Sequence, residues 1–298
     1  MAWVRLDIPC DPDAADVVAA LVLAETGRGA SLLEHDAATV VQAWTPENWQ
    51  PELEERLKQR LLAAGPPYSD GADAIAAVTI ADDDWTLGWR RHFSPFRVGR
   101  RMVIKPSWES WPPAGRADLA RPDDLIIEID PGEAFGTGTH ASTQLALRAL
   151  EGTVGIGSTV ADVGCGSGIL SLAARLLGAS RLVAVDFDPA AAQSTLRNLR
   201  AQGLAGDAGV LIGEGLAAIR GRFDVVVANI TADGAIAVGS QVADRLRPGG
   251  RYIVSGFLER SVPRVERALV RFGLAPMNGD ALDGWASLIL ARAGESAR

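Results

Sequence analysis

The sequence predicts an α/β fold with a mostly parallel sheet, joined to a smaller α+β domain at the N-terminus. From residue 159 onward, apolar strand-like runs alternate with helical segments, which is typical of a parallel sheet covered by helices on both faces. Before residue 81 the order is βαββαβ, which is typical of a ferredoxin-like unit of two helices on an antiparallel sheet. The chain has 298 residues, a length that suits two domains.

The N-terminal domain is predicted over residues 1–80. Its strands are expected in "AWVRLDI", "SLLEHD", "TVVQAW" and "AIAAVTIA", and its first helix over residues 12–26. Leu53, Leu57 and Leu61 recur at helical spacing before Gly65, which predicts the second helix and its end. His35 has no His or Cys companion at metal-ligand spacing, so we interpret it as a surface or turn histidine. With no catalytic constellation, this domain is expected to be a recognition module.

A segment rich in Trp and Arg follows and marks the domain boundary. We expect a linker over residues 81–97 and a catalytic domain over residues 98–298, with a short helix, capped by Asp83 or Asp84, that runs through Arg91 to a stop at Pro95. The aromatic and basic residues of this segment are Trp85, Trp89, Trp108, Trp111, Arg90, Arg91, Arg97, Arg100, Arg101 and Lys105. Two interpretations remain open: packing between the domains, or a basic, aromatic wall that faces a substrate.

The catalytic domain is predicted to begin with a strand in "DLIIEID", a glycine-containing loop, "PGEAFGTGTH", and a helix from Thr139 to Leu150. Further strands are expected in "TVADVG", "RLVAVDF", "GVLIGEG", "FDVVVANI", "RYIVSGF" after an "RPGG" turn, and "WASLILAR". Helices are expected over residues 168–179, 189–203, 233–246 and 262–272. Ligands of such sheets bind at the carboxyl ends of the strands, near the point where the strand order reverses.

The glycine turn after the strand "TVADVG" indicates which ligand is bound. Gly164, Gly166 and Gly168 form G-x-G-x-G after Asp162, and not the G-x-G-x-x-G pattern that holds a pyrophosphate. An acid at the end of a strand suits a cationic ligand, and Asp186 at the end of the next strand can accept hydrogen bonds from both hydroxyls of a ribose. A ligand with a ribose, no phosphate and a cationic amino-acid end is S-adenosylmethionine. The alternative is a purely structural glycine turn.

Asn229 closes the strand "FDVVVAN" and is the candidate catalytic residue. Methyl transfer to nitrogen is an in-line displacement, so the enzyme must hold a neutral amine with its lone pair behind the methyl group. The amide of Asn229 and nearby backbone carbonyls can accept the N–H groups of such an amine. The alternative is an asparagine that only satisfies a strand-to-helix turn.

Composition narrows the class of partner and the compartment. A net charge of −8 and a pI near 5.0 argue against a nucleic-acid binder that works through a broad basic field. Cys10 and Cys165 provide neither a disulfide framework nor a metal-ligand set. The first residues resemble no secretory signal, and no apolar run is long enough to span a membrane. We therefore expect a cytoplasmic protein without a metal site or a membrane partner.

Five stretches resemble, in order and spacing, the ribosomal protein L11 methyltransferase family (PrmA). They are "VIKPSWE", "DPGEAFGTGTHAST", "DVGCGSGILSLAA", "VAVDFDP" and "VVVANITAD". The resemblance, which includes the N-terminal module, implies a Rossmann-like class I S-adenosylmethionine-dependent methyltransferase fold and a substrate-recognition domain that moves about a linker. Carried over by motif, the cofactor contacts fall on Thr143, Gly164, Asp186 and Asn229.

This chain departs from the family pattern at three positions. Ala141 and Ser142 stand where the family usually has Pro and Thr, and Thr231 stands where it usually has Leu. Because Thr143 is retained, cofactor binding is expected to persist, whereas Thr231 lies near the presumed amine site and is expected to alter the substrate pocket.

The resemblance implies a protein-lysine N-methyltransferase of ribosomal protein L11, with the N-terminal α-amine of that protein as a further target. The partner is L11, free or on the large ribosomal subunit, and nucleic acid is no direct substrate. His140 is either a proton acceptor or a residue that shapes the cofactor cleft. Alternatives are a lysine methyltransferase of another protein, such as an electron-transfer flavoprotein subunit, a small-molecule methyltransferase, and a non-catalytic binding protein with this fold.

Overall fold

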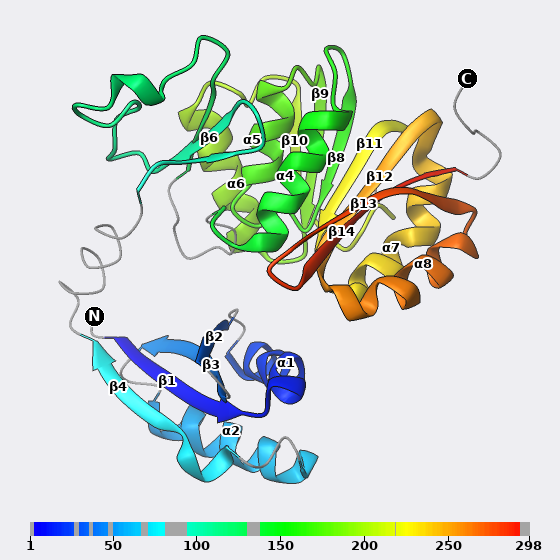
Figure 1. The fold of residues 1–298 in the computed structure, drawn as a ribbon. Coiled ribbons are helices and arrows are strands. Elements are labelled where there is room, and N and C mark those ends of the chain that lie inside the picture. Colours follow the sequence, from blue (N-terminus) through cyan, green and yellow to red (C-terminus); the bar gives the residue numbers. More distant parts are fainter. Residues whose placement is uncertain are drawn as a thin grey trace. The chain divides into compact units, whose positions relative to one another are not determined.

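The computed structural model describes residues 3–26, 30–35, 38–46, 50–66, 71–80, 94–129, 138–217 and 219–292. The chain divides into two compact units, residues 1–93 and 94–298 (Figure 1). This division falls inside the segment predicted as the linker, and the strand β5 already begins at Phe96. The short helix predicted to end at Arg91 lies outside the described residues.

The N-terminal unit has the predicted βαββαβ order. Its elements are β1 (Trp3–Cys10), α1 (Ala15–Thr26), β2 (Ser31–His35), β3 (Ala38–Pro46), α2 (Gln50–Ala64) and β4 (Ala76–Ile80). The sheet order is β2-β3-β1-β4 and all three pairings are antiparallel, so the ferredoxin-like prediction is confirmed. His35 is the last residue of β2 and pairs with Ala38, the first residue of β3.

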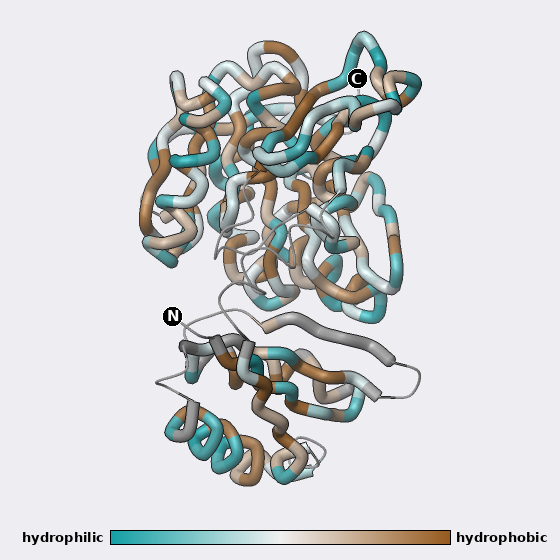
Figure 2. Tube along the Cα trace, turned by 90° about the vertical axis from the view of Figure 1, so that its left-hand side faces the viewer, coloured by the Kyte–Doolittle hydropathy of each residue, from teal (hydrophilic) through white to brown (hydrophobic). Residues whose placement is uncertain are grey.

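Alternation along β1 and helical spacing along α2 build the core of this unit. Leu6 and Ile8 of β1 are fully buried with Leu53 and Leu57 of α2. Figure 2 shows hydrophilic and hydrophobic residues alternating around the turns of α2, as the leucine spacing requires. The helix ends before Gly65, whose φ of +72° provides the left-handed residue that commonly terminates a helix.

The second unit is built on a seven-stranded sheet with the order β10-β9-β8-β11-β12-β14-β13. Its strands are β8 (Thr159–Val163), β9 (Arg181–Asp186), β10 (Ala208–Ile212), β11 (Phe223–Asn229), β12 (Leu246–Leu258), β13 (Leu274–Leu282) and β14 (Trp285–Arg292). The pairings from β10 to β12 are parallel, and β14 runs antiparallel to both neighbours. The strand order reverses between β8 and β11, which is the switch point of a Rossmann-like sheet.

Helices cover this sheet on both faces, as predicted (Figure 1). They are α4 (Ala141–Thr153), α5 (Ile169–Leu176), α6 (Pro189–Ala201), α7 (Ala232–Arg245) and α8 (Val262–Val270). Helix α5 packs between α4 and α6, while α7 and α8 pack against each other. Buried side chains of the sheet, α7 and α8 form one apolar cluster that includes Tyr252, Leu269 and Leu290. The carboxyl ends of β8, β9 and β11 are therefore the edge at which a site is expected.

A small three-stranded sheet precedes this core, and two of its strands were not predicted. It has the order β5-β6-β7, with β5 (Phe96–Val98), β6 (Met102–Lys105) and β7 (Leu125–Glu128). Strand β7 is the predicted "DLIIEID" strand. Strands β5 and β6 are only three and four residues long and contain Arg97 and Lys105, so hydrophobic alternation did not reveal them. Residues 106–124 connect β6 to its parallel neighbour β7 and lie mostly on the surface.

The sequence also gave no indication of β13, the edge strand of the large sheet. Its sequence, "LAPMNGDAL", contains Pro276, Asn278 and Gly279, which are poor strand formers, and its register shifts between Pro276 and Asn278. Proline is tolerated on an edge strand because no further strand needs its missing N–H group. The predicted "RPGG" turn is instead an irregularity within β12. The register with β11 shifts there, because Phe223 pairs with Leu246 but Val225, two residues later, pairs with Arg251.

Candidate active site

Backbone conformation explains the glycine turn after β8. Gly164, Gly166 and Gly168 all have positive φ angles, of 73°, 53° and 84°, which L-residues with side chains rarely adopt. At Gly164 a Cβ atom would lie 2.5 Å from Cγ2 of Ile230, the residue after Asn229. The turn and the end of β11 therefore approach so closely that only glycine fits between them.

Asp186, the last residue of β9, is held against this turn. Its Oδ2 accepts the backbone N–H of Gly166 at 2.9 Å, and its Oδ1 accepts that of Asp188 at 3.0 Å. Each carboxylate oxygen has a second lone pair, so each can still accept one hydrogen bond from a hydroxyl group of a ligand. Asp186 thus has a second task that the sequence did not reveal, because it also orders the backbone on both sides of the proposed ribose position.

Asp162, expected to face a cationic ligand, lies inside the protein. It is 0% exposed, and its Oδ2 accepts a hydrogen bond from Ser171 Oγ at 2.7 Å. Within the described part of the chain, its Oδ1 has no hydrogen-bond partner. Burial raises the pKa of Asp162 to about 7, and the nearby Asp186 adds to the shift. Asp162 thus points into the layer between β8 and α5, and its role toward a cationic ligand stays a prediction.

Asn229 and Thr143, 86 residues apart in the sequence, meet at the carboxyl edge of β11. Asn229 Nδ2 donates to Thr143 Oγ1 at 3.1 Å, and Thr143 is fully buried in the first turn of α4. This bond fixes the amide so that Oδ1 is the remaining acceptor. Among the described residues no group donates to that buried oxygen. An unsatisfied buried acceptor is costly, so it is well suited to receive a ligand N–H group.

His140 is the N-cap of α4, directly before these residues. Its Nδ1 accepts the backbone N–H of Ser142 at 3.3 Å and lies 2.8 Å from Ser142 Oγ. Its ring packs edge-on against Trp285, with 4.5 Å between centroids. Burial lowers the pKa of His140, which favours the neutral imidazole. Since Nδ1 is already engaged as an acceptor, these contacts favour the interpretation that His140 shapes the cleft.

The departure at Thr231 has a structural reason. Thr231 is the N-cap of α7, and its Oγ1 accepts the backbone N–H of Gly234 at 3.3 Å. Leucine, which the family pattern has here, cannot cap a helix in this way. Ser142 is another residue that differs from the family pattern. Its backbone carbonyl can accept a hydrogen bond from Ser255 Oγ at 3.0 Å.

Ser255 and Trp285 belong to the site region but were missed in the sequence. Ser255 of β12 is fully buried, and its Oγ lies 3.0 Å from the carbonyl oxygens of both Ser142 and Ala286, to either of which it can donate its proton. It therefore connects α4 to the sheet beside Asn229, its register partner in β11. The one available signal was a serine in the middle of the apolar strand "YIVSGF". No periodicity reveals that Trp285 contacts His140, because that contact joins the two ends of the catalytic unit.

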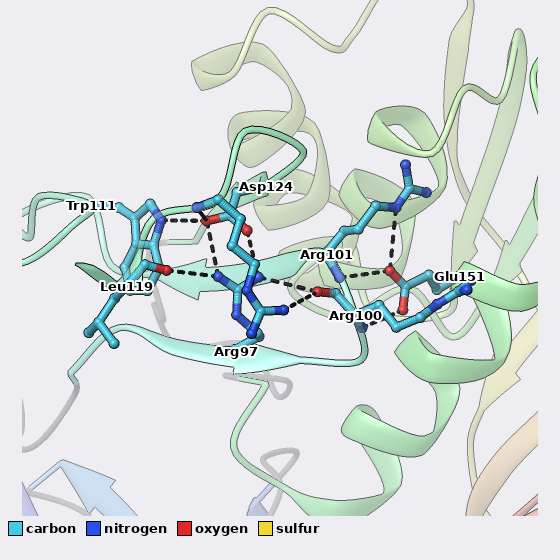
Figure 3. A network of polar contacts seen from close by, with 8 residues as sticks. Arg97, Arg100, Arg101, Trp111, Leu119, Asp124 and Glu151 are labelled. Atoms are coloured by element: carbon cyan, nitrogen blue, oxygen red, sulfur yellow. Dashed lines mark hydrogen bonds and ion pairs between the residues drawn. The ribbon is translucent and has the colours of Figure 1, made fainter. Parts of the chain in front are cut away.

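Within the described part of the Trp and Arg segment, a network of polar contacts holds several of its side chains (Figure 3). The two interpretations, packing between the domains and a wall that faces a substrate, stay predictions. Arg97 forms two hydrogen bonds with the Asp124 carboxylate, at 2.5 and 3.0 Å, and lies over the ring of Trp111. Trp111 Nε1 donates to the same carboxylate at 3.0 Å. These contacts hold the pKa of Asp124 at about 2, mainly through Arg97. The basic and aromatic side chains thus secure the base of the 106–124 connection.

Glu151 fastens the β5–β6 turn to α4 (Figure 3). Its buried carboxylate accepts the backbone N–H groups of Arg100 and Arg101, at 2.7 and 2.9 Å. Gly99 precedes them with a φ of +65°, and a Cβ atom there would lie 2.3 Å from Glu151 Oε2. Lys105 of β6 forms an ion pair with Glu128 of the neighbouring strand β7, with 2.5 Å between Nζ and Oε2. Trp85, Trp89, Arg90 and Arg91 lie outside the described residues.

The described residues contain no group of three or more His, Cys, Asp or Glu side chains arranged to hold a metal ion. They also contain no helix that is long and apolar enough to cross a membrane.

Comparison with known proteins identifies the family. The family model described as "Ribosomal protein L11 methyltransferase (PrmA)" matches residues 2–293. The chain belongs to this family. It is 38% identical to the ribosomal protein L11 methyltransferase of Pelotomaculum thermopropionicum, over 97% of this chain and 98% of that one. It is also 38% identical to the protein of the same description in Geobacter metallireducens, over 95% and 96% of the two chains.

A solved structure supports the same assignment. The ribosomal protein L11 methylase of Lactobacillus delbrueckii subsp. bulgaricus superposes with a TM-score of 0.62 and 32% identity, over 67% of this chain and all of that one. The class I methyltransferase fold expected from the resemblance is thereby confirmed. In this PrmA family member, the structure brings the four predicted site residues to one edge of the sheet: Thr143, Gly164, Asp186 and Asn229. The "AFGT" part of the glycine loop, residues 134–137, lies outside the described residues.

Proposed function

We propose that this chain is a cytoplasmic S-adenosylmethionine-dependent methyltransferase that methylates lysine side-chain amines, and the N-terminal α-amine, of ribosomal protein L11. Its membership of the PrmA family supports the substrate. The observation that carries the chemistry is the Asn229–Thr143 pair, because it leaves one buried amide oxygen without a donor next to the glycine turn.

The residues present fit S-adenosylmethionine, which would supply an electrophilic methyl group on a sulfonium. Asp186 keeps one lone pair on each oxygen for the hydroxyls of a ribose. Gly164 removes the side chain that would otherwise fill the space between the turn and Ile230. We assign cofactor binding to Thr143, Gly164, Asp186 and Asn229.

Asn229 is proposed to act on the amine. Its Oδ1 would accept an N–H of a neutral lysine amine and so direct the nitrogen lone pair, while Thr143 prevents the amide from rotating. No residue needs to act as a covalent nucleophile in a direct displacement. Burial of the site disfavours the ammonium form of the lysine, and the proton is expected to leave to water.

Residues 1–80 are proposed to recognise the protein substrate, residues 81–97 to serve as a linker, and residues 98–298 to carry the chemistry. The compact N-terminal unit supports this division, because it has its own hydrophobic core. Its described residues include no group of side chains that we assign to catalysis. Its role would be to raise the effective concentration of L11 lysines near Asn229. L11 would be bound either free or on the large ribosomal subunit, and nucleic acid would be no direct substrate.

Mass spectrometry of ribosomal proteins from cells lacking this chain tests the proposal. We expect L11 to lose mass in whole methyl increments, and re-expression of the intact chain to restore them. The proposal fails if L11 keeps its full mass. Methyl loss from a different protein, such as an electron-transfer flavoprotein subunit, would reassign the substrate.

A further inference from the structure

Ile230, the residue that follows Asn229, is enclosed by glycines of three different segments. A Cβ atom at Gly164 would lie 2.5 Å from Ile230 Cγ2, and one at Gly256 of β12 would lie 2.5 Å from the backbone oxygen of Ile230. At Gly234 of α7 a Cβ atom would lie 3.2 Å from Ile230 Cδ1. Side chains at Gly164 and Gly256 would therefore displace Ile230, so these glycines fix the point at which β11 ends.

Ser255, directly before Gly256, holds the same point of the backbone through its carbonyl group. It is the register partner of Asn229 in the parallel pairing of β11 with β12. Its backbone oxygen accepts the N–H of Ile230 at 3.0 Å. The strand β12 thus restrains the main chain immediately after the Asn229 side chain.

The hydroxyl of Ser255 reaches the other half of the pair. Ser255 is 0% exposed, and its Oγ lies 3.0 Å from the carbonyl oxygen of Ser142, the residue before Thr143 in the first turn of α4. The carbonyl of Ala286 is the alternative acceptor, also at 3.0 Å. One buried residue therefore contacts both chain segments that bring Asn229 and Thr143 together.

The bond between Asn229 and Thr143 tolerates little relative movement of these segments. It joins Nδ2 to Oγ1 at 3.1 Å. Hydrogen bonds of this type extend to about 3.2 Å, so a displacement of α4 from β11 by a few tenths of an ångström would weaken it. The amide could then rotate, and Oδ1 would no longer point at the amine. Reacting groups must be held to within about 0.5 Å of their productive geometry.

We propose that Ser255 is a positioning residue of the methyl transfer. Its carbonyl holds the backbone after Asn229 and its hydroxyl holds the turn that carries Thr143, so together they set the direction of Asn229 Oδ1. Because Ser255 is fully buried, it acts through Asn229 and not on the substrate itself. The inference rests on the proposed function, since it takes Asn229 Oδ1 as the acceptor of the amine.

A double-mutant cycle tests whether Ser255 acts through Asn229. In the full-length chain, with L11 and S-adenosylmethionine at saturation, Ser255→Ala should lower kcat about threefold to tenfold, the factor typical of one neutral hydrogen bond. The KM for L11 and the Kd for the cofactor should change less than kcat. In the Asn229→Ala background the same substitution should have no further effect, because the group that Ser255 positions is gone.

Two variants separate the hydrogen bond from side-chain volume and from general stability. Ser255→Cys nearly keeps the volume, but a thiol is a weak donor, so kcat should fall as in Ser255→Ala. Ser287→Ala removes a 3% exposed hydroxyl from β14, at the register partner of Ser255 and one strand further from Asn229, and should leave kcat unchanged. Full kcat in Ser255→Cys would show that volume matters, and would overturn the assignment.

A spectroscopic readout needs no methyl acceptor. The side-chain amide of Asn229 gives a pair of proton–nitrogen correlations in NMR spectra, which are assigned by their loss in Asn229→Ala. We expect Ser255→Ala to shift or broaden both signals, as Thr143→Val should, because the bond to Thr143 is weakened. Ser287→Ala should leave them in place.

The outcomes distinguish this inference from the proposed function. An equal loss of kcat in both backgrounds, with an unmoved Asn229 amide signal in Ser255→Ala, would overturn the role of Ser255 and leave the proposed reaction intact. A chain that transfers no methyl group to L11 but shows the shifted amide signal would retain Ser255 as the residue that positions Asn229 and refute the proposed reaction.

Discussion

At the scale of single residues, the Asn229–Thr143 hydrogen bond carries the proposed chemistry. We expect Asn229→Ala to lower kcat about 10-fold to 100-fold, because it removes the acceptor for the amine, worth about 1–3 kcal/mol. The affinity for S-adenosylmethionine should fall much less. Steady-state kinetics at saturating cofactor, together with calorimetry, measure both quantities.

Thr143 provides the matched control for this prediction. Thr143→Val removes the acceptor of Asn229 Nδ2 at nearly constant volume and should lower kcat, whereas Thr143→Ser keeps the hydroxyl and should restore most of it. A cofactor-binding defect in Asn229→Ala, with unchanged turnover at saturation, would contradict the assignment of Asn229 to the amine.

Asp186 is proposed to bind the cofactor, and it also orders the local backbone. Asp186→Ala removes both proposed ribose acceptors, so the affinity for S-adenosylmethionine should fall about 10²-fold to 10⁴-fold. The same substitution leaves the N–H groups of Gly166 and Asp188 without their acceptor, so the melting temperature should also fall. Asp186→Asn keeps one of these acceptors and should be less destabilising. Near wild-type affinity of Asp186→Ala in calorimetry would remove this residue from the site.

At the scale of elements, Asp124 secures the connection between β6 and β7. Its pKa is lowered from 3.8 to about 2 in the folded protein. A carboxylate with a lowered pKa stabilises the fold fully above its unfolded pKa, near 4, and this contribution is lost as the pH falls through about 2. The free energy of unfolding of the wild-type chain should therefore decrease more between pH 4 and 2 than that of Asp124→Asn.

Denaturant unfolding at several pH values measures this difference. At pH 7 the Asp124→Asn variant should be the less stable chain, because it loses the charge-assisted bonds to Arg97. Parallel pH dependences of the two chains would show that Asp124 does not titrate as the geometry implies.

At the scale of the whole molecule, the division into two units is proposed to separate substrate recognition from chemistry. A chain that begins near Asp82 keeps every residue assigned to the cofactor and all of the second compact unit. It should fold and bind S-adenosylmethionine, but methylate intact L11 poorly, since the proposed docking module is gone. A short lysine peptide, which needs no docking, should be affected much less.

Rates on the two substrates and a circular dichroism spectrum check this expectation. Modification of intact L11 at the full-length rate would argue against a recognition role for residues 1–80. Failure of the truncated chain to fold would show that the Trp and Arg segment needs the N-terminal unit.

The sequence by itself determined the features that depend on local patterns. Leucine spacing in α2, alternation in β1 and the turn at Gly164 are each properties of a few consecutive residues, so both units and the order of most elements were predictable. Tertiary structure decided what depends on long-range contact. Strand β13 forms, despite Pro276 and Gly279, because β14 offers it a partner, and β5 and β6 form because Glu151 and Asp124 fix the turn and the connection that flank them.

The site divides in the same way. Motifs predicted Thr143, Gly164, Asp186 and Asn229 as site residues, but the bond that orients Asn229 joins residues 86 positions apart. The burial of Asp162 also depends on how α5 packs on β8, because Ser171 provides the partner for its carboxylate. A sequence pattern specifies which polar groups stand at the end of a strand. Which of them remain available to a ligand is decided only when the neighbouring elements have satisfied the others.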